Sequence, residues 1–356
     1  MRIKSYFLLS LLYLLILGGC TREKLSDCIP PQGGVILKYS YWLNMDYANL
    51  FGAKVNDLKV FVFDRDGILC DTLSPAVVAG ELNNDWTRQV YLDPGVYSFV
   101  TWGGDLGFSD VFDFTDSGSG MSVKNIVIGT TRLSDFRAGL KSITESMPQN
   151  QQLGRLFHGL QRDVEVKAGE VTTLVTPLVR DTKTVRVKII GLDQLAQPDA
   201  DESDFYMRLA VRNGQYNYDN VADSVAPLLV YEPHSRTMDG DTVKADISTL
   251  RLWRFRQGNG YSAPLLSVTY KPTDKVVCKD LDVTDLILSA KIPARDDDGH
   301  LISDAEGKPE MVYPTSEYLD RQDLFEILFE IKNVNGQLQF TVYVNGWIIQ
   351  NIIPEP

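Results

Sequence analysis

The chain has 356 residues, 44% hydrophobic and 23% charged, with a formal net charge of -12. This composition is typical of a globular protein with enough apolar residues for one or two cores. The acidic balance, with a pI of about 4.8, argues against nucleic-acid binding and against electrostatic attachment to an anionic membrane, because both require a basic face. Beyond the N-terminus no stretch reaches 18 apolar residues, so we expect no second membrane span.

The N-terminus predicts export and a lipid attachment site. Arg2 and Lys4 precede an apolar run over residues 6–17, which ends in Gly18-Gly19-Cys20. A basic start, a short apolar run and small residues at the exit are the pattern of a secretory signal. The small-small-Cys ending resembles the lipobox of bacterial lipoproteins, in which the Cys thiol is acylated and the chain is cut before it. An ordinary cleaved signal with a cysteine nearby is the alternative.

Acylation at Cys20 would anchor the mature chain without a protein span. Each buried methylene contributes about 0.8 kcal/mol, so one acyl chain holds only marginally, whereas two or three hold firmly. We therefore predict a signal peptide at residues 1–19 and a lipidated tether at residues 20–32.

Three cysteines, Cys28, Cys70 and Cys278, remain after the lipidation site. An exported protein sits where disulfides form. Cys28 and Cys70 lie on either side of the first expected strand pair, so a disulfide between them is one interpretation. Free thiols that pack as small hydrophobic groups are the other. The cysteine spacing fits no zinc pattern.

Strand patterns fill the first half of the chain. Apolar and β-branched runs lie at residues 35–41, 58–63, 90–92, 96–102, 164–166 and 171–178. Asp64-Arg65-Asp66-Gly67 predicts a turn with glycine at positive φ, and Asp93-Pro94-Gly95 predicts a type II turn into a return strand. Ala168-Gly169 predicts a further turn. Residues 133–142 predict a short helix.

The second half continues in the same style. Residues 184–189 alternate cleanly, with Val185, Val187 and Ile189 on one face. Further strands are expected at residues 205–211, 250–255, 265–270, 325–331, 338–344 and 347–349. Asn335-Gly336 predicts a two-residue hairpin turn of the primed type. Turns are also expected at Asn213-Gly214 and Asn345-Gly346.

Many short strands with glycine turns between them predict an all-β chain, built most simply from β-sandwiches. The polar segment Arg180–Lys183 separates two strands, so we place a domain boundary there. The expected domains are an N-terminal sandwich at residues 33–181 and a C-terminal sandwich at residues 182–356.

Catalytic and metal-site motifs are missing from the sequence. No metalloprotease helix, phosphate-binding loop, serine-hydrolase elbow or dinucleotide fingerprint occurs. His158, His234 and His300 are far apart in sequence, and we expect them to be structural or on the surface. We therefore expect no enzyme, no metal and no cofactor, although the 47 carboxylates leave a glycosidase pair open.

Two further patterns have both a functional and a structural interpretation. Asp296-Asp297-Asp298-Gly299 resembles part of a calcium loop, but two ligand positions hold Ala294 and Ala305, which favours an acidic surface turn. Aromatic residues such as Tyr39, Tyr41 and Trp42 suggest a sugar platform. Alternating strands more often place such residues in cores.

Several segments, taken in their order along the chain, resemble one family. They are Lys24–Cys28, Tyr39–Asp46, Val60–Asp64, Leu92–Tyr97, Thr101–Gly104, Leu156–Gly159, Leu178–Val187 and Asn345–Trp347. Together with the lipobox they resemble the lipoprotein anchor subunits of fimbriae in Bacteroidales, the minor-fimbrium anchor and FimB-type family.

This resemblance implies a fold of two tandem transthyretin-like β-sandwich domains. It also implies that the protein lies at the base of a fimbrium, on the surface of the outer membrane. It implies stalk subunits as partners, joined by β-strand complementation, and no catalytic residues. In the family, stalk precursors lose an N-terminal piece by cleavage after an arginine. Between Cys20 and Arg65 only Arg22 is available, and cleavage there would remove the lipid but no strand. The chain therefore suits an anchor rather than a stalk.

Other functions remain open from sequence alone. A surface glycan-binding lipoprotein would use exposed aromatics, a fimbrial tip or adhesin subunit would share the fold, and a lipid-anchored hydrolase would use carboxylates. The sequence does not indicate whether the chain donates or accepts a strand.

Overall fold

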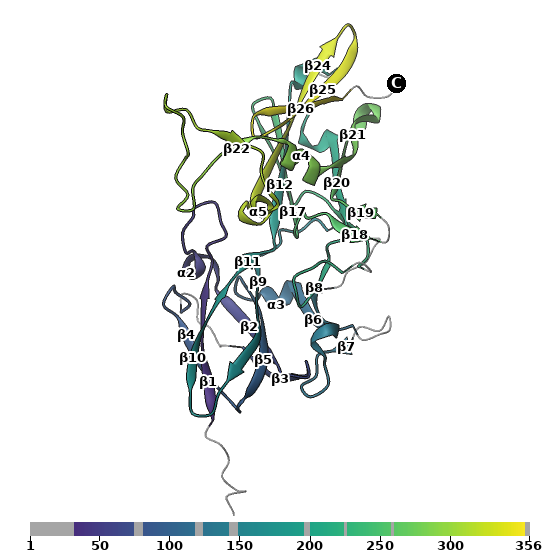
Figure 1. Cartoon of the computed structure of the whole chain (residues 1–356). Helices are drawn as coiled ribbons and strands as arrows, with labels where there is room; N and C mark the ends of the chain where they lie inside the picture. The colour runs from purple at the N-terminus through teal and green to yellow at the C-terminus, as the bar shows by residue number, and fades with distance from the viewer. Residues whose placement is uncertain are drawn as a thin grey trace, which may run out of the picture.

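The computed structural model describes residues 32–74, 81–117, 124–141, 149–195, 200–223, 226–257 and 260–352. Most of them lie in β-strands that form several sheets, and the helices among them are short. The predicted all-β fold class is confirmed, whereas transthyretin-like tandem domains stay a prediction. Figure 1 shows an elongated molecule with β1 (Gly33–Ser40) at its lower end.

Two sheets face each other in the N-terminal half. One contains, in spatial order, β10 (Val171–Pro177), β1 and β4 (Thr87–Leu92). The other contains β11 (Val179–Arg180), β9 (Leu156–Val166), β5 (Gly95–Gly104), β2 (Asp57–Phe63) and β3 (Leu69–Leu73). Alternation directs Val35, Leu37 and Tyr39 of β1 inward, where they pack in one cluster with Val60 and Val62 of β2.

Two predicted turns in this half are crossovers between the sheets. Pro94 and Gly95 connect β4, which pairs with β1, to β5, which pairs with β2 and β9. The expected type II turn is wrong, because Gly95 does not have the positive φ that such a turn requires. The strand expected after it is present as β5, but it does not pair back with β4. Gly169, by contrast, has a φ of 72° where β9 gives way to β10 of the other sheet. The turn before Gly67 is confirmed, with Gly67 at a φ of 72°.

A third sheet, of four strands, joins the two halves. Its order is β14 (Gln215–Asn217), β8 (Phe136–Leu140), β6 (Phe112–Asp116) and β7 (Lys124–Asn125). The helix predicted over residues 133–142 is wrong, since only Leu133–Asp135 forms a 3-10 turn before β8. Phe136, Ala138 and Leu140 are buried at every second position, which is the period of a strand.

The C-terminal half contains a six-stranded and a four-stranded sheet. The first has the order β16 (Ser235–Asp239), β17 (Thr242–Thr249), β12 (Lys183–Ile190), β24 (Leu324–Val334), β25 (Gln337–Val344) and β26 (Trp347–Ile352). The second has the order β15 (Leu229–Tyr231), β13 (Phe205–Val211), β20 (Leu265–Tyr270) and β21 (Lys275–Asp282). Val185, Val187 and Ile189 are fully buried between them, as predicted.

The two asparagine–glycine hairpin turns near the C-terminus are confirmed. Asn335 and Gly336 both have positive φ, as do Asn345 and Gly346, which is the geometry of a primed turn. Asn213-Gly214 is different, because it carries the chain from β13 to β14 in the third sheet instead of closing a hairpin. The strand expected over residues 250–255 is wrong: residues 250–254 form no strand, and a short strand, β18 (Phe255–Gln257), follows them.

Apolar packing is continuous through the junction of the two halves. Phe61 and Trp102 lie on the face of the N-terminal sheet that meets Phe114 and Phe136 of the third sheet. The same cluster extends into the C-terminal sandwich, where it includes Val187 and Phe329. The boundary proposed at residues 181 and 182 falls between β11 and β12, and the division into two domains stays a prediction.

Candidate functional site

The polar segment between β11 and β12 is buried. Asp181, Thr182 and Lys183 are 0%, 1% and 1% exposed. Arg180 pairs with β9 and Lys183 pairs with β17, so the connection runs through the interior. Buried charges are costly unless they find partners, and the surrounding elements supply them.

Lys183 is held by the end of a short helix, α5 (Ser316–Arg321). Its Nζ donates to the carbonyl oxygens of Asp320 at 2.6 Å and Gln322 at 3.0 Å, and lies 3.9 Å from Asp323 Oδ1. Burial lowers the pKa of Lys183 to about 8, against the opposing effect of the carboxylates of Asp323, Asp320 and Asp181. The ammonium therefore ties the start of β12 to the segment that begins β24.

Asp181 is incompletely paired. Its Oδ1 accepts a hydrogen bond from Asn220 Nδ2 at 2.8 Å and lies 3.8 Å from Arg251 Nε. Its Oδ2 is buried and has no hydrogen-bond partner within the described part of the chain. Burial raises the pKa of Asp181 to about 7, although Arg251 acts in the opposite direction.

Arg251 organises the other side of this cluster. Its guanidinium binds both oxygens of Asp320, with Nη2 at 2.8 Å from each, and its centre lies 4.7 Å from the ring centroid of Trp253. The indole Nε1 of Trp253 donates to the same carboxylate at 2.9 Å. Arg251 Nη1 donates to the carbonyl oxygen of Asn220 at 2.8 Å. The arginine and the indole are therefore fixed by each other and by Asp320.

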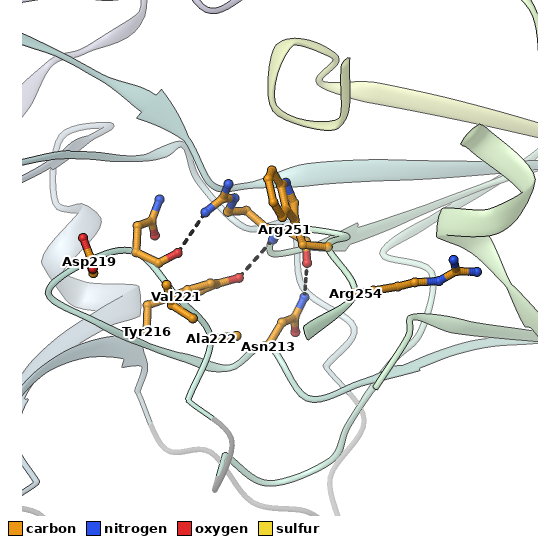
Figure 2. Close-up of a pocket in the computed structure, with 9 residues that line it drawn as sticks. Asn213, Tyr216, Asp219, Val221, Ala222, Arg251 and Arg254 are labelled. Carbon is orange, nitrogen blue, oxygen red and sulfur yellow. Dashed lines mark hydrogen bonds between the residues drawn. The ribbon is translucent and has the colours of Figure 1, made fainter. Parts of the chain in front are cut away.

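A cavity of about 380 Å³ opens beside this cluster (Figure 2). Tyr216 and Asn213 form part of its wall and are buried. The Tyr216 hydroxyl accepts from the backbone N–H of Arg251 at 3.1 Å, and Asn213 Nδ2 donates to the carbonyl oxygen of Arg251 at 3.0 Å. The rest of the lining consists of Asp219, Asn220, Val221, Ala222, Arg251, Trp253 and Arg254. Because these hydrogen bonds hold the lining side chains in place, the cavity is pre-formed, and its volume is in the range that small ligands occupy.

A second surface of interest is the outer edge of the six-stranded sheet. Among the described residues β26 pairs with β25 alone, so its other edge is open. Trp347 and Ile348 on this strand are 41% and 61% exposed. Lys291 lies 5.4 Å from the Trp347 ring and 5.8 Å from the ring of Tyr313, which is 64% exposed. The edge therefore combines unpaired backbone groups with exposed apolar side chains.

The family model of the fimbrillin-A associated anchor proteins Mfa1 and Mfa2 matches residues 25–353. The chain belongs to this anchor protein family. The resemblance seen in the sequence is thereby confirmed, and with it a fimbrium-associated anchoring role.

One curated relative and two solved structures are similar to this chain. The minor fimbrium anchoring subunit Mfa2 of Porphyromonas gingivalis is 25% identical over 283 residues, which cover 77% of this chain and 78% of that protein. The solved structure of Mfa2 from Porphyromonas gingivalis shares the fold, with a TM-score of 0.65 and 22% identity over 90% of this chain and all of the other. A candidate polysaccharide-binding protein of Bacteroides thetaiotaomicron has a TM-score of 0.68 and 26% identity, covering 89% and 98% of the two chains.

The lipidation site predicted for this anchor family chain, Cys20, lies outside the described residues, as does Cys28. Cys70 is partly buried, and its thiol donates to the carbonyl oxygen of Val62 at 3.3 Å. The disulfide between Cys28 and Cys70 therefore stays a prediction. Cys278 is buried in the C-terminal core, and burial raises the pKa of its thiol to about 12. None of the described helices is long and apolar enough to span a bilayer.

The three histidines have separate surroundings; His234 is half-buried, and its backbone N–H donates to the carbonyl oxygen of Asp246. His158 is buried, its Nε2 lies 3.0 Å from the carbonyl oxygen of Tyr218, and its ring packs edge-on against Trp102. Burial lowers the pKa of His158 to about 4, so the ring is neutral at physiological pH. His300 is exposed beside Asp296. Within the described ranges no group of three metal-ligating side chains occurs.

The acidic segment at residues 296–299 is a surface turn. Asp296 Oδ1 accepts from the backbone N–H groups of Asp298 at 3.1 Å and His300 at 2.8 Å, and Gly299 has a φ of 84°. A Cβ on Gly299 would lie 2.3 Å from Cγ of Tyr47 in the N-terminal half, so this glycine allows the turn to pack there.

The aromatic residues singled out in the sequence do not form a platform together. Tyr39 and Tyr41 are each 1% exposed in the N-terminal core, and only Trp42 is exposed, at 57%. Sequence reasoning missed the cluster around Asp181 and Lys183, because the segment looked like a polar linker. One signal was present: Lys183 is in phase with Val185, Val187 and Ile189 on the buried face.

Proposed function

We propose that this protein is an outer-membrane lipoprotein that anchors a fimbrium at its base and holds the stalk by strand addition. The observation that carries the proposal is the family match over residues 25–353. The lipobox ending at Cys20 supports membrane attachment by acyl chains, and the formal net charge of -12 disfavours electrostatic attachment to an anionic membrane.

The positions of the tether and of the C-terminal hairpins at opposite ends of the molecule support this arrangement. The tether precedes β1, which begins at the lower end of the molecule in Figure 1, whereas the hairpins of β24, β25 and β26 lie at the opposite end. A lipid at Cys20 would leave the upper end free to meet a stalk subunit. The apolar segment from Trp347 is the protein's own last strand here, paired with β25 over Trp347–Ile352.

We place strand addition at the open edge of β26. This strand, Trp-Ile-Ile-Gln-Asn-Ile, has no charged residue, whereas the opposite edge strand β16 contains Arg236 and Asp239. Charges on edge strands discourage pairing with another chain, so their absence favours it. The edge of β10 is less available, because Gln161 Nε2 donates to the carbonyl oxygen of Val175 at 2.9 Å. A partner strand on β26 would bond its backbone and cover Trp347 and Ile348.

The test is to replace Ile348 by lysine on this edge. Ile348 is 61% exposed, so Ile348→Lys should leave the fold intact but disfavour pairing. We expect recovery of stalk subunit with the affinity-purified anchor to fall at least tenfold. Val334→Lys, at the 40% exposed tip of β24, is the matched control and should retain the stalk. Equal stalk recovery from both variants would contradict docking at β26.

Immunogold labelling separates anchoring from the adhesin alternative. We expect gold particles where the fibre meets the cell. Label at the free fibre tip would instead assign the protein to a tip subunit.

A further inference from the structure

We propose that the cavity beside Trp253 binds one unit of a neutral glycan, a function separate from fimbrial anchoring. The cavity is pre-formed, and its lining combines an exposed aromatic ring with hydrogen-bonding side chains. Those are the two features that a pyranose ring needs, because it has an apolar C–H face and a polar hydroxyl edge.

Trp253 supplies the stacking surface. The ring is 36% exposed, although Arg251 covers part of it at 4.7 Å and Asp320 accepts from its Nε1 at 2.9 Å. These contacts fix the indole, so little side-chain entropy is lost when a ligand stacks on it. The electron-rich face of an aromatic ring attracts the weakly positive C–H groups of a sugar.

The lining of the cavity includes the carboxylate of Asp219, which is labelled in Figure 2. The Asp219 side chain is 46% exposed, and its Oδ1 bonds Arg162 at 2.6 Å. A carboxylate accepts several hydrogen bonds, so Asp219 has capacity left for sugar hydroxyls. Val221, which is 52% exposed, and Ala222 provide apolar surface next to it.

Charge favours a neutral sugar over an acidic one. Arg251 is paired with Asp320, and Arg254 is paired with Asp282 and Asp285, so neither arginine is a free anion site. Asp219 and the net charge of -12 would repel a uronic acid or phosphate. A purely apolar side chain of a protein partner fits less well, because it would desolvate Asp219 without a compensating hydrogen bond.

The experiment is affinity electrophoresis of the purified mature protein in native gels that contain xyloglucan, galactomannan, α-mannan or dextran, with hyaluronate as the acidic comparison. We expect retardation by at least one neutral polysaccharide and none by hyaluronate. Trp253→Ala should weaken binding at least tenfold, measured by titration of that polysaccharide. Trp42→Ala is the matched control, since Trp42 is exposed but outside the cavity, and it should bind like the wild type.

A second variant separates loss of the site from loss of the fold. Trp253→Ala also removes a hydrogen bond to Asp320, whereas Val221→Trp only fills the mouth of the cavity. We expect Val221→Trp to unfold at the wild-type temperature and yet lose binding. The proposal is overturned if no neutral polysaccharide retards the wild type, if hyaluronate alone does, or if both cavity variants bind within twofold of it. All these variants should still anchor fimbriae, so failure here leaves the anchoring proposal standing.

Discussion

At residue 183 a lysine continues the alternation that carries Val185, Val187 and Ile189 into the core. The sequence predicts the three apolar positions, but the period of two also places Lys183, two residues before Val185, on the same face. Its partners Asp320 and Gln322 lie 137 and 139 residues along the chain. No local pattern in the sequence connects residues so far apart. The strand β12 was therefore predicted, but the buried cluster around Asp181 and Lys183 was not.

Asp181 makes the stability of the protein depend on pH. Burial raises its pKa from 3.8 to about 7, so the folded state holds a proton more tightly than the unfolded state. The stabilisation from that proton is complete below the unfolded pKa and is lost as pH rises towards 7. Asp181→Asn mimics the protonated side chain. We expect its free energy of unfolding to fall less between pH 4 and pH 7.5 than that of the wild type, by a few kcal/mol.

Urea unfolding at several pH values measures this difference. Asp297→Asn, in the exposed acidic turn, is the control and should follow the wild-type pH profile. If the profiles of Asp181→Asn and the wild type are parallel, then Asp181 is not the group responsible.

At the scale of elements, local turn chemistry predicted hairpins but not the choice of sheet. Asn335-Gly336 closes β24 and β25 because both residues accept positive φ, and that information is local. Pro94-Gly95 looks equally turn-like, yet it carries the chain between two sheets, because β4 pairs with β1 and β5 with β2. Strand partners are set by packing of the whole sandwich, which a single stretch of sequence does not contain.

Gly336 tests the local part of this explanation. Its φ is 85°, and a Cβ there would meet no atom within 4 Å, so Gly336→Ala adds backbone strain without a clash. We expect the free energy of unfolding to fall by about 1 kcal/mol. Asn335→Gly, in the same turn, needs no strained conformation and should change stability by a smaller amount. Urea titration of both variants provides the measurement, and an unchanged Gly336→Ala midpoint would argue against a primed turn.

The whole molecule is a continuous stack of sheets with two distinct ends. The N-terminal sandwich begins at β1, the third sheet joins β8 to β14, and the C-terminal sheet ends in β26. The all-β class and the anchor family were predicted from strand patterns and ordered motifs. The third sheet was not predicted, because it combines strands from residues 112–140 with a strand of only three residues, 215–217, that lies far along the chain.

The central proposal is that a lipid at Cys20 attaches this stack, and the fimbrium built on it, to the outer membrane. The most direct measurement compares cells that produce the wild type with cells in which Cys20→Ser is exported behind an ordinary cleavable signal. Fimbriae are quantified in the cell-bound fraction and in the medium, and incorporation of a labelled fatty acid is followed in both strains. We predict label only on the wild type and release of fimbriae into the medium from the variant strain. Fimbriae that stay equally cell-bound without the lipidated cysteine would contradict the proposal.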